Sequence, residues 1–168
     1  MSGGYSEGGF EFMPDGSMVM FLRSTHASMI GIEWGPMYYS RSEDAGITWT
    51  KPVKFSEIGV SPKLCRLDCG AVLLYFGRPG AYLCATTDPS GKKWEAPITL
   101  LKPKGRQHLA NVKIDMPTFF EWEGICYNDC LLATGFDTAL IFYSDFYYPD
   151  NDGVKRKTVL CREIRCTI

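Results

Sequence analysis

The segment S-E-D-A-G-I-T-W at residues 42–49, together with its relative T-T-D-P-S-G-K-K-W at residues 86–94, decides how this chain folds. In each segment an Asp, a Gly and a Trp follow one another at short spacing. An Asp in a tight turn accepts backbone N–H groups, a Gly adopts positive φ, and a Trp covers the hairpin. Gly91 follows Gly46 by 45 residues, and the Trp residues have the same spacing. The pattern indicates a repeated unit that closes on this turn.

Each unit begins with the pattern of a β-hairpin, in which a short apolar run, turn residues and a second apolar run follow one another. Three such pairs occur: 10–12 with 18–22, 64–67 with 72–76, and 130–132 with 139–143. Gly70 follows Gly16 by 54 residues, and Arg78 follows Arg23 by 55. Runs that are apolar at every position are typical of strands covered on both faces. Four short strands per unit at this period predict propeller blades, which need a neighbour on each side.

We therefore predict an all-β fold, a partial β-propeller of about three four-stranded blades that forms a single domain over residues 1–168. The blades are expected at 9–55, 61–101 and 119–168, with an insertion at 102–118 between the last two. In the third blade, strands are expected at 119–123 or 126–132, at 138–144 and at 158–165, and the outermost strand is missing. Signals for helices are nearly absent.

Composition excludes several classes of protein. The 168 residues carry 18 Lys and Arg against 19 Asp and Glu, so a surface for nucleic acid or an anionic membrane is not expected. Hydrophobic residues make up 45% of the chain, which excludes a disordered protein. No apolar run approaches the roughly 18–20 residues that span a bilayer. We expect a cytoplasmic protein if Met1 is the native start, and a secreted or periplasmic one if upstream sequence is missing.

The seven cysteines are expected to be reduced thiols, because their number is odd and the first residues lack a secretory signal. Cys65 with Cys69 and Cys126 with Cys130 form two C-x3-C pairs, a spacing that also occurs in zinc sites. These pairs lie among β-type residues, and neither histidine is near them in sequence. We therefore favour small buried side chains over a metal site.

The S-x-D-x-G-x-x-W pattern resembles the Asp-box, or bacterial neuraminidase repeat, of the sialidase superfamily. The matching positions are Ser42, Asp44, Gly46 and Trp49 in the first box, and Asp88, Gly91 and Trp94 in the second. The second box has one extra residue between its Asp and its Gly. The resemblance covers nearly the whole chain, but only the second half of a sialidase. It implies that the box residues are structural and lie on the blade rim, away from the active site.

Four other residues resemble parts of the sialidase site. Glu7 precedes the Asp15-Gly16 turn, Arg23 follows Glu7 by 16 residues, and Arg78 lies ten residues before the second box aspartate. Tyr127 begins a hairpin similar to the one that carries the family's nucleophile. The resemblance implies that Arg23 and Arg78 bind the substrate carboxylate, that Tyr127 attacks the sugar, and that Glu7 takes the phenolic proton.

The reaction implied by the resemblance is release of a terminal α-linked sialic acid with retention of configuration. Sialic acid bears a carboxylate at its anomeric carbon, so a carboxylate nucleophile would be repelled, whereas a neutral tyrosine is not. The family chemistry requires no metal and no organic cofactor. Sialic acid or another carbohydrate is the expected partner.

The chain departs from the family in length. The family fold has six blades, which at about 55 residues each need roughly 330 residues. The family's first triad Arg and its Asp acid/base lie in the early blades, and Asp115 in the insertion is a loose candidate for the Asp. The missing half is expected from upstream sequence or from another chain, and the open blade faces predict self-association.

Two alternative functions stay open at this point. One is a non-catalytic carbohydrate-binding or assembly module, and the other is a sialidase-like hydrolase of another sugar, because one fold hosts many activities.

Overall fold

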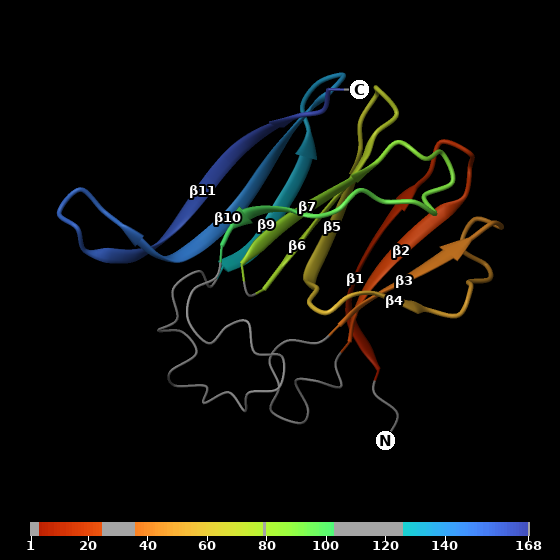
Figure 1. Cartoon of the computed structure of the whole chain (residues 1–168), viewed down its shortest axis with the longest axis horizontal. Helices are drawn as coiled ribbons and strands as arrows, with labels where there is room; N and C mark the ends of the chain where they lie inside the picture. The colour runs from red at the N-terminus through yellow and green to blue at the C-terminus, as the bar shows by residue number, and fades with distance from the viewer. Residues whose placement is uncertain (1–3, 25–35, 79, 103–125, 168) are drawn as a thin grey trace.

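The computed structural model describes residues 4–24, 36–78, 80–102 and 126–167. Within these residues all eleven regular elements are β-strands, and none of the described residues forms a helix long and apolar enough to cross a membrane. The strands form three antiparallel sheets that fan out side by side (Figure 1). The prediction of an all-β partial propeller is confirmed.

In every sheet the strands that neighbour one another in the chain also pair with one another. Sheet 1 contains β1 (Tyr5–Phe12), β2 (Met18–Ser24), β3 (Met37–Ser42) and β4 (Val53–Ser56). Sheet 2 contains β5 (Val60–Arg66), β6 (Val72–Gly77), β7 (Ala81–Thr86) and β8 (Ile98–Leu101). Sheet 3 contains β9 (Cys126–Ala133), β10 (Thr138–Pro149) and β11 (Lys155–Arg165).

Sheet 3 has three strands in the part of the chain that the structure describes, whereas the other two sheets have four. Its first strand corresponds to the predicted 126–132. The alternative strand at 119–123, Asp115 and all but the first residue of the predicted insertion lie outside the described residues. The last two strands are longer than predicted and form a hairpin that projects beyond the fan (Figure 1).

The first hairpin of each sheet has the same architecture. Five residues connect the paired positions Phe12 and Met18, Arg66 and Val72, and Ala133 and Ala139. In each loop the first residue donates its N–H to the carbonyl of the last one, at 2.8–2.9 Å. The three hairpins can therefore be compared residue by residue, with Met18, Val72 and Ala139 at equivalent positions.

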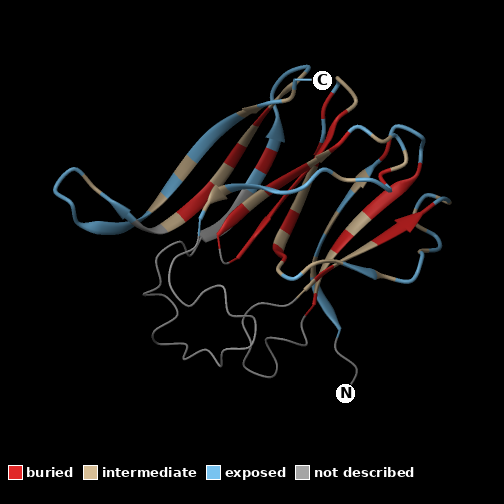
Figure 2. Ribbon diagram, viewed as in Figure 1, coloured by how far each residue is buried: buried red, intermediate tan, exposed pale blue. Residues whose placement is uncertain are grey.

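The core lies between the sheets, and β6 is its centre. All six residues of β6 are buried. Val72, Leu74 and Phe76 belong to the hydrophobic cluster with sheet 1, while Leu73 and Tyr75 belong to the cluster with sheet 3. Figure 2 shows this middle sheet as the most continuously buried part of the molecule. The prediction of a strand covered on both faces is thus confirmed for 72–76.

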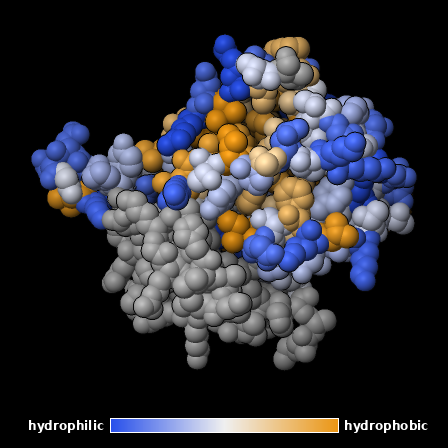
Figure 3. All heavy atoms as spheres, in the orientation of Figure 1, coloured by the Kyte–Doolittle hydropathy of each residue, from blue (hydrophilic) through white to orange (hydrophobic). Residues whose placement is uncertain are grey.

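The equivalent runs in β2 and β10 are covered less completely. Met20 and Leu22 in β2, and Leu140 and Phe142 in β10, are only half-buried. Sheets 1 and 3 each pack against sheet 2 on one face alone within the described residues. Figure 3 shows hydrophobic side chains gathered over sheets 2 and 3 on the face in view, while the projecting β10–β11 turn is hydrophilic.

The innermost strands β1 and β5 approach each other closely at Gly9. A Cβ atom at this position would lie 2.6 Å from the Pro62 carbonyl oxygen and 2.9 Å from Cδ1 of Leu64. Because the first of these neighbours is backbone, it cannot move without shifting β5. The absence of a side chain at Gly9 therefore sets how near sheets 1 and 2 can pack.

Arg41 links sheet 1 to sheet 2 at the opposite end of the strands. Its Nε donates to the Ser90 carbonyl at 3.0 Å, and its Nη2 donates to Asp15 Oδ2 at 2.9 Å. Hydrogen bonds from Ser17, and then the charge of Arg41, lower the pKa of Asp15 below its ordinary value of 3.8. This guanidinium connects the first hairpin of sheet 1 to the second box turn.

Replacing Gly9 by Ala should destabilise the protein by about 1–3 kcal/mol, the usual cost of overpacking. Gly8→Ala is the matched control, because its Cβ would meet the movable end of Leu22 at 3.3 Å and the Phe21 carbonyl oxygen at an ordinary contact distance of 3.7 Å. We expect Gly8→Ala to change stability by less than about 1 kcal/mol. Urea unfolding monitored by tryptophan fluorescence would compare them, and equal losses for both variants would contradict the close approach.

Candidate functional site

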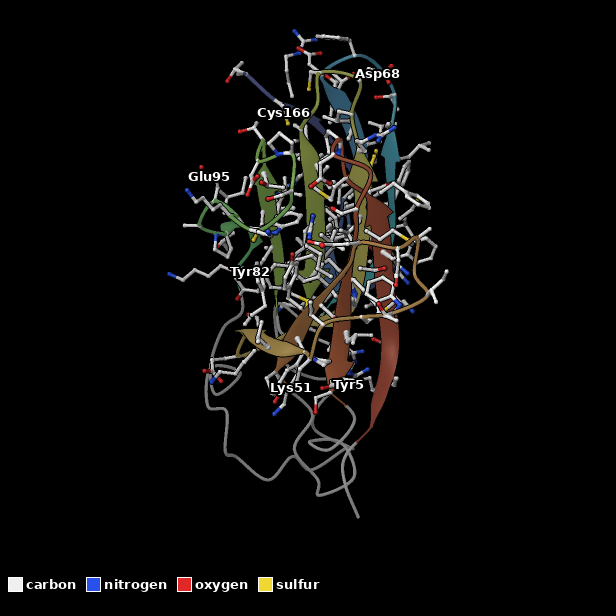
Figure 4. The ribbon with its side chains drawn as sticks, turned by 90° about the vertical axis from the view of Figure 1, so that its right-hand side faces the viewer. Tyr5, Lys51, Asp68, Tyr82, Glu95 and Cys166 are labelled. Atoms are coloured by element: carbon white, nitrogen blue, oxygen red, sulfur yellow. The ribbon has the colours of Figure 1, made fainter. Side chains whose placement is uncertain are left out.

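The three inner strands β1, β5 and β9 begin at one end of the fan. β1 contacts β5, and β5 contacts β9. Figure 4 shows Tyr5, in the first of these strands, at this end, and Asp68, in the β5–β6 loop, at the opposite end. Because β2 and β6 run antiparallel to the inner strands, their last residues reach the end at which the inner strands begin. We call this end of the sheets the strand-start end.

Glu7 and Arg23 form an ion pair at the strand-start end. Glu7 lies in β1, which begins before the predicted blade start at residue 9, and Arg23 is the penultimate residue of β2. Arg23 Nη1 donates to Glu7 Oε1 at 2.9 Å, and the two side chains are 13% and 39% exposed. The structure thus brings together two of the four residues that the sequence places in the site.

Ser61 is a neighbour of this pair that the sequence analysis missed. Its backbone N–H donates to the other carboxylate oxygen of Glu7, Oε2, at 2.6 Å. Ser61 has φ of +52°, a left-handed conformation that is uncommon for a residue other than glycine, and it lies in a β-bulge between Val60 and Lys63. The sequence signal was Pro62, because a proline within a strand is typical of a bulge or an edge.

Arg78 directly follows β6, at the same end of sheet 2. Gly77, the residue before it, pairs with Val60, the residue before Ser61. The Arg78 residue is only 4% exposed. A buried guanidinium is rare unless it is paired, so this position is unlike that of an ordinary surface arginine.

Tyr127 is the second residue of β9, where its backbone pairs with Ser144 of β10. This places its main chain at the strand-start end of sheet 3, while its side chain lies outside the described atoms. A bulge also interrupts the β9–β10 pairing near this point, as one does in β1 between Tyr5 and Gly8. All three inner strands therefore carry an irregularity near their first residues, a feature often found beside active sites.

The first box turn, 42–49, lies at the far end of β3. Met37, at the start of β3, pairs with Arg23, whereas Ser42 pairs with Met18. Thr48 donates its backbone N–H and its hydroxyl to the two oxygens of Asp44, at 2.8 and 2.5 Å. Trp49 Nε1 donates to the Gly46 carbonyl at 3.0 Å, and Gly46 has φ of +87°.

The second box turn has the same organisation despite its extra residue. Asp88 accepts the backbone N–H groups of Ser90, Lys92 and Lys93 at 3.0–3.1 Å. Trp94 Nε1 donates to the Gly91 carbonyl at 2.7 Å, and the Trp94 ring packs edge-to-face on Phe21 of sheet 1 at 5.1 Å between centroids. The box therefore closes its own turn and also contributes to the core between sheets 1 and 2.

The described cysteine side chains differ in their exposure. Of the two C-x3-C pairs, Cys65 is buried as expected, Cys69 is half-buried, and the Cys126 side chain lies outside the described atoms. Cys84 is also buried, and desolvation raises its pKa to about 12. Cys130 and Cys161 are exposed, so the prediction of burial is wrong for Cys130. The described residues contain no group of three or more His, Cys, Asp or Glu side chains arranged to hold a metal ion.

No protein-family model matches this chain, and no curated protein matches it. Solved structures do match. A protein of unknown function from Dyadobacter fermentans has a TM-score of 0.64 at 17% identity, over 98% of this chain and 39% of that one. A PL25 ulvan lyase bound to -[GlcA(1-4)Rha3S]- has a TM-score of 0.61 at 14% identity, over 93% and 37%. The Penicillium chrysogenum α-L-arabinanase complexed with arabinobiose has a TM-score of 0.54 at 16% identity, over 96% and 46%.

These similarities show the fold. The named enzymes are β-propellers that act on carbohydrates, and this chain spans less than half the length of each. The three sheets therefore correspond to part of a propeller.

The Asp44 turn generates a pH-dependent prediction. Hydrogen bonds from Thr48, and then from Ser42, lower the pKa of Asp44 from 3.8 to about 2. Because the folded-state pKa is depressed, the stabilisation is present above about pH 4 and is lost as the pH falls through about 2. Asp44→Ala should lower the thermal midpoint at pH 7, and the difference from the unaltered protein should shrink below pH 4.

Differential scanning fluorimetry between pH 2 and pH 7 would measure this difference. Asp152→Ala, in the exposed β10–β11 turn, is the control and should leave the midpoint almost unchanged. A constant difference across the whole pH range would mean that ionisation of Asp44 does not stabilise the turn.

Proposed function

We propose that the strand-start end binds a carboxylated sugar and belongs to a glycosidase of the sialidase type. In this proposal Arg23 and Arg78 hold the sugar carboxylate, Tyr127 is the nucleophile, and Glu7 is its base. The observation that carries the proposal is the Glu7–Arg23 ion pair, braced by the Ser61 backbone, at the end where the three inner strands begin. The Glu7 carboxylate and the Arg23 guanidinium thus lie together at the strand-start end, with the orientation of the carboxylate fixed by its hydrogen bonds.

The chemistry of the two arginines suits a carboxylate ligand. A guanidinium carries five N–H donors in a rigid fork that matches the two oxygens of a carboxylate. Arg78 lies on the neighbouring sheet and is almost fully buried, so a bound anion would be only weakly screened by solvent.

The role proposed for Glu7 requires a fixed orientation. A general base must lie within hydrogen-bond reach of the proton that it takes. Glu7 is held through one oxygen by Arg23 on its own sheet and through the other by Ser61 on sheet 2. Such bracing limits the rotation of the carboxylate, as the role of base for Tyr127 on the third inner strand would require.

A second candidate function is carbohydrate binding without turnover. The part of the chain that the structure describes forms three sheets, and the chain covers less than half of the enzymes with the same fold. A partial ring can retain the arginines and lack the acid that protonates the leaving group. Uronic acids also present a carboxylate, and the ulvan lyase structure holds a GlcA unit, so a sugar other than sialic acid is compatible with the same arginines.

Binding should therefore depend on the carboxylate. We expect N-acetylneuraminic acid or glucuronic acid to bind, and glucose not to bind, in isothermal titration calorimetry. Arg78→Ala should weaken binding about 10- to 100-fold, because one charged hydrogen-bonding partner is lost. Arg66→Ala is the control, since Arg66 is exposed at the opposite end of β5. Binding of neither acid would overturn the proposal.

Turnover separates the two candidate functions. Release of the fluorophore from a 4-methylumbelliferyl sialoside, abolished by Tyr127→Phe, would support the glycosidase. Binding of the carboxylated sugar without release would favour the binding module.

A further inference from the structure

Residues at equivalent positions of the three hairpins differ in burial, and the difference identifies one face of sheet 1 that no described sheet covers. In β2, Met20 and Leu22 occupy the positions that Leu74 and Phe76 occupy in β6, and that Ile141 and Tyr143 occupy in β10. The four residues in β6 and β10 are at most 1% exposed, because they pack on the preceding sheet. Met20 and Leu22 are as apolar, yet they are only half-buried.

The opposite face of sheet 3 shows the complementary pattern. Leu140 and Phe142 occupy the positions of Val19 and Phe21 in β2 and of Leu73 and Tyr75 in β6. Those four residues are 0% exposed, because they pack on the following sheet. Leu140 and Phe142 are only half-buried, and Leu132 and Val159 on the same sheet are 52% and 66% exposed.

Among the residues that the structure describes, the sheets therefore leave one face of each kind without a neighbouring sheet. On sheet 1 it is the face of Met20 and Leu22, which in the other sheets packs on the preceding sheet. On sheet 3 it is the face of Leu140 and Phe142, which in the other sheets packs on the following sheet. Within the described residues the same two kinds of face already meet twice, between sheets 1 and 2 and between sheets 2 and 3.

We propose that two copies of this chain close head to tail into one ring, with sheet 3 of each copy packed on sheet 1 of the other. When two different faces of a protein pack on each other, successive copies form a filament unless the rotation between copies closes a ring. Two copies related by a twofold axis close such a ring and form two identical interfaces. Two copies would supply six sheets, and one copy covers 37% of the ulvan lyase and 46% of the arabinanase, which have the same fold.

The closed dimer would also complete the strand-start end. Each copy would bring its own Glu7, Arg23 and Arg78 to the same end of a shared ring. A sugar bound at the centre would then be surrounded by inner strands on all sides. This assembly rests on the packing faces and not on the proposed sugar-binding function, so its test needs no ligand.

The equivalence also predicts which residues meet across the new interface. A Cβ on Gly9 of β1 would lie 2.9 Å from Leu64 of β5. By the hairpin register, Cys130 is the equivalent of Gly9, and Phe10 is the equivalent of Leu64. Cys130 and Phe10 are both exposed within one chain, and in the dimer each Cys130 would face Phe10 of the other copy.

Two measurements test the assembly. Sedimentation equilibrium of the full chain should give twice the mass of 18.9 kDa. Phe10→Cys under mild oxidation should give a disulfide-linked dimer on a non-reducing gel, and Phe10→Cys combined with Cys130→Ser should not. Asp152→Cys is the matched control, because Asp152 is exposed in the β10–β11 turn, which projects beyond the fan (Figure 1).

Leu22→Glu should convert the dimer to a monomer while the sheets remain folded, because it places a charge in the proposed interface. Circular dichroism and the urea midpoint would verify folding of this variant. A mass of 18.9 kDa for the unaltered chain at all concentrations, or cross-linking by Asp152→Cys as strong as by Phe10→Cys, would overturn the head-to-tail dimer.

Discussion

Packing of one sheet face on the next sheet is the interaction on which the rest of this structure depends. The second strand of every sheet carries apolar residues on both faces, so a sheet needs a neighbour to bury them. The hydrophobic clusters lie between sheets rather than within them, and β6 contributes alternate residues to both. The missing side chain at Gly9 and the Arg41 contacts fix the two ends of the first interface, one by close approach and one by charge.

Most of the fold could be predicted from the repeated hairpin pattern and its period. The hairpins at 10–22, 64–76 and 130–143 were predictable because apolar runs, turn residues and their spacing recur together, and the structure confirms the strands. The lengths of β10 and β11 were not predictable, since their ends extend to Pro149 and from Lys155, beyond the repeated hairpin pattern, where the period gives no signal. Local hydrogen bonds to Asp150 from Val154 and Arg156 hold that turn instead.

The candidate site was predictable only in part. Glu7, Arg23 and Arg78 were proposed from their position relative to repeated turns, and the structure pairs the first two directly. Ser61 was missed because it acts through its backbone N–H, which any residue possesses, so side-chain chemistry gives no signal for it. The exposure of Cys130 was also missed, since burial there depends on a neighbouring sheet rather than on the local sequence.

The order of strands has a consequence for how the chain folds. Each sheet is an up-and-down meander whose strands pair with their sequence neighbours, so each can form through short loops at low entropic cost. Each sheet becomes stable only when the next sheet packs on it, because the hydrophobic clusters between sheets join residues far apart in the chain. During synthesis the first meander therefore stays exposed until β6 has emerged, and this interval is when a chaperone would protect it best.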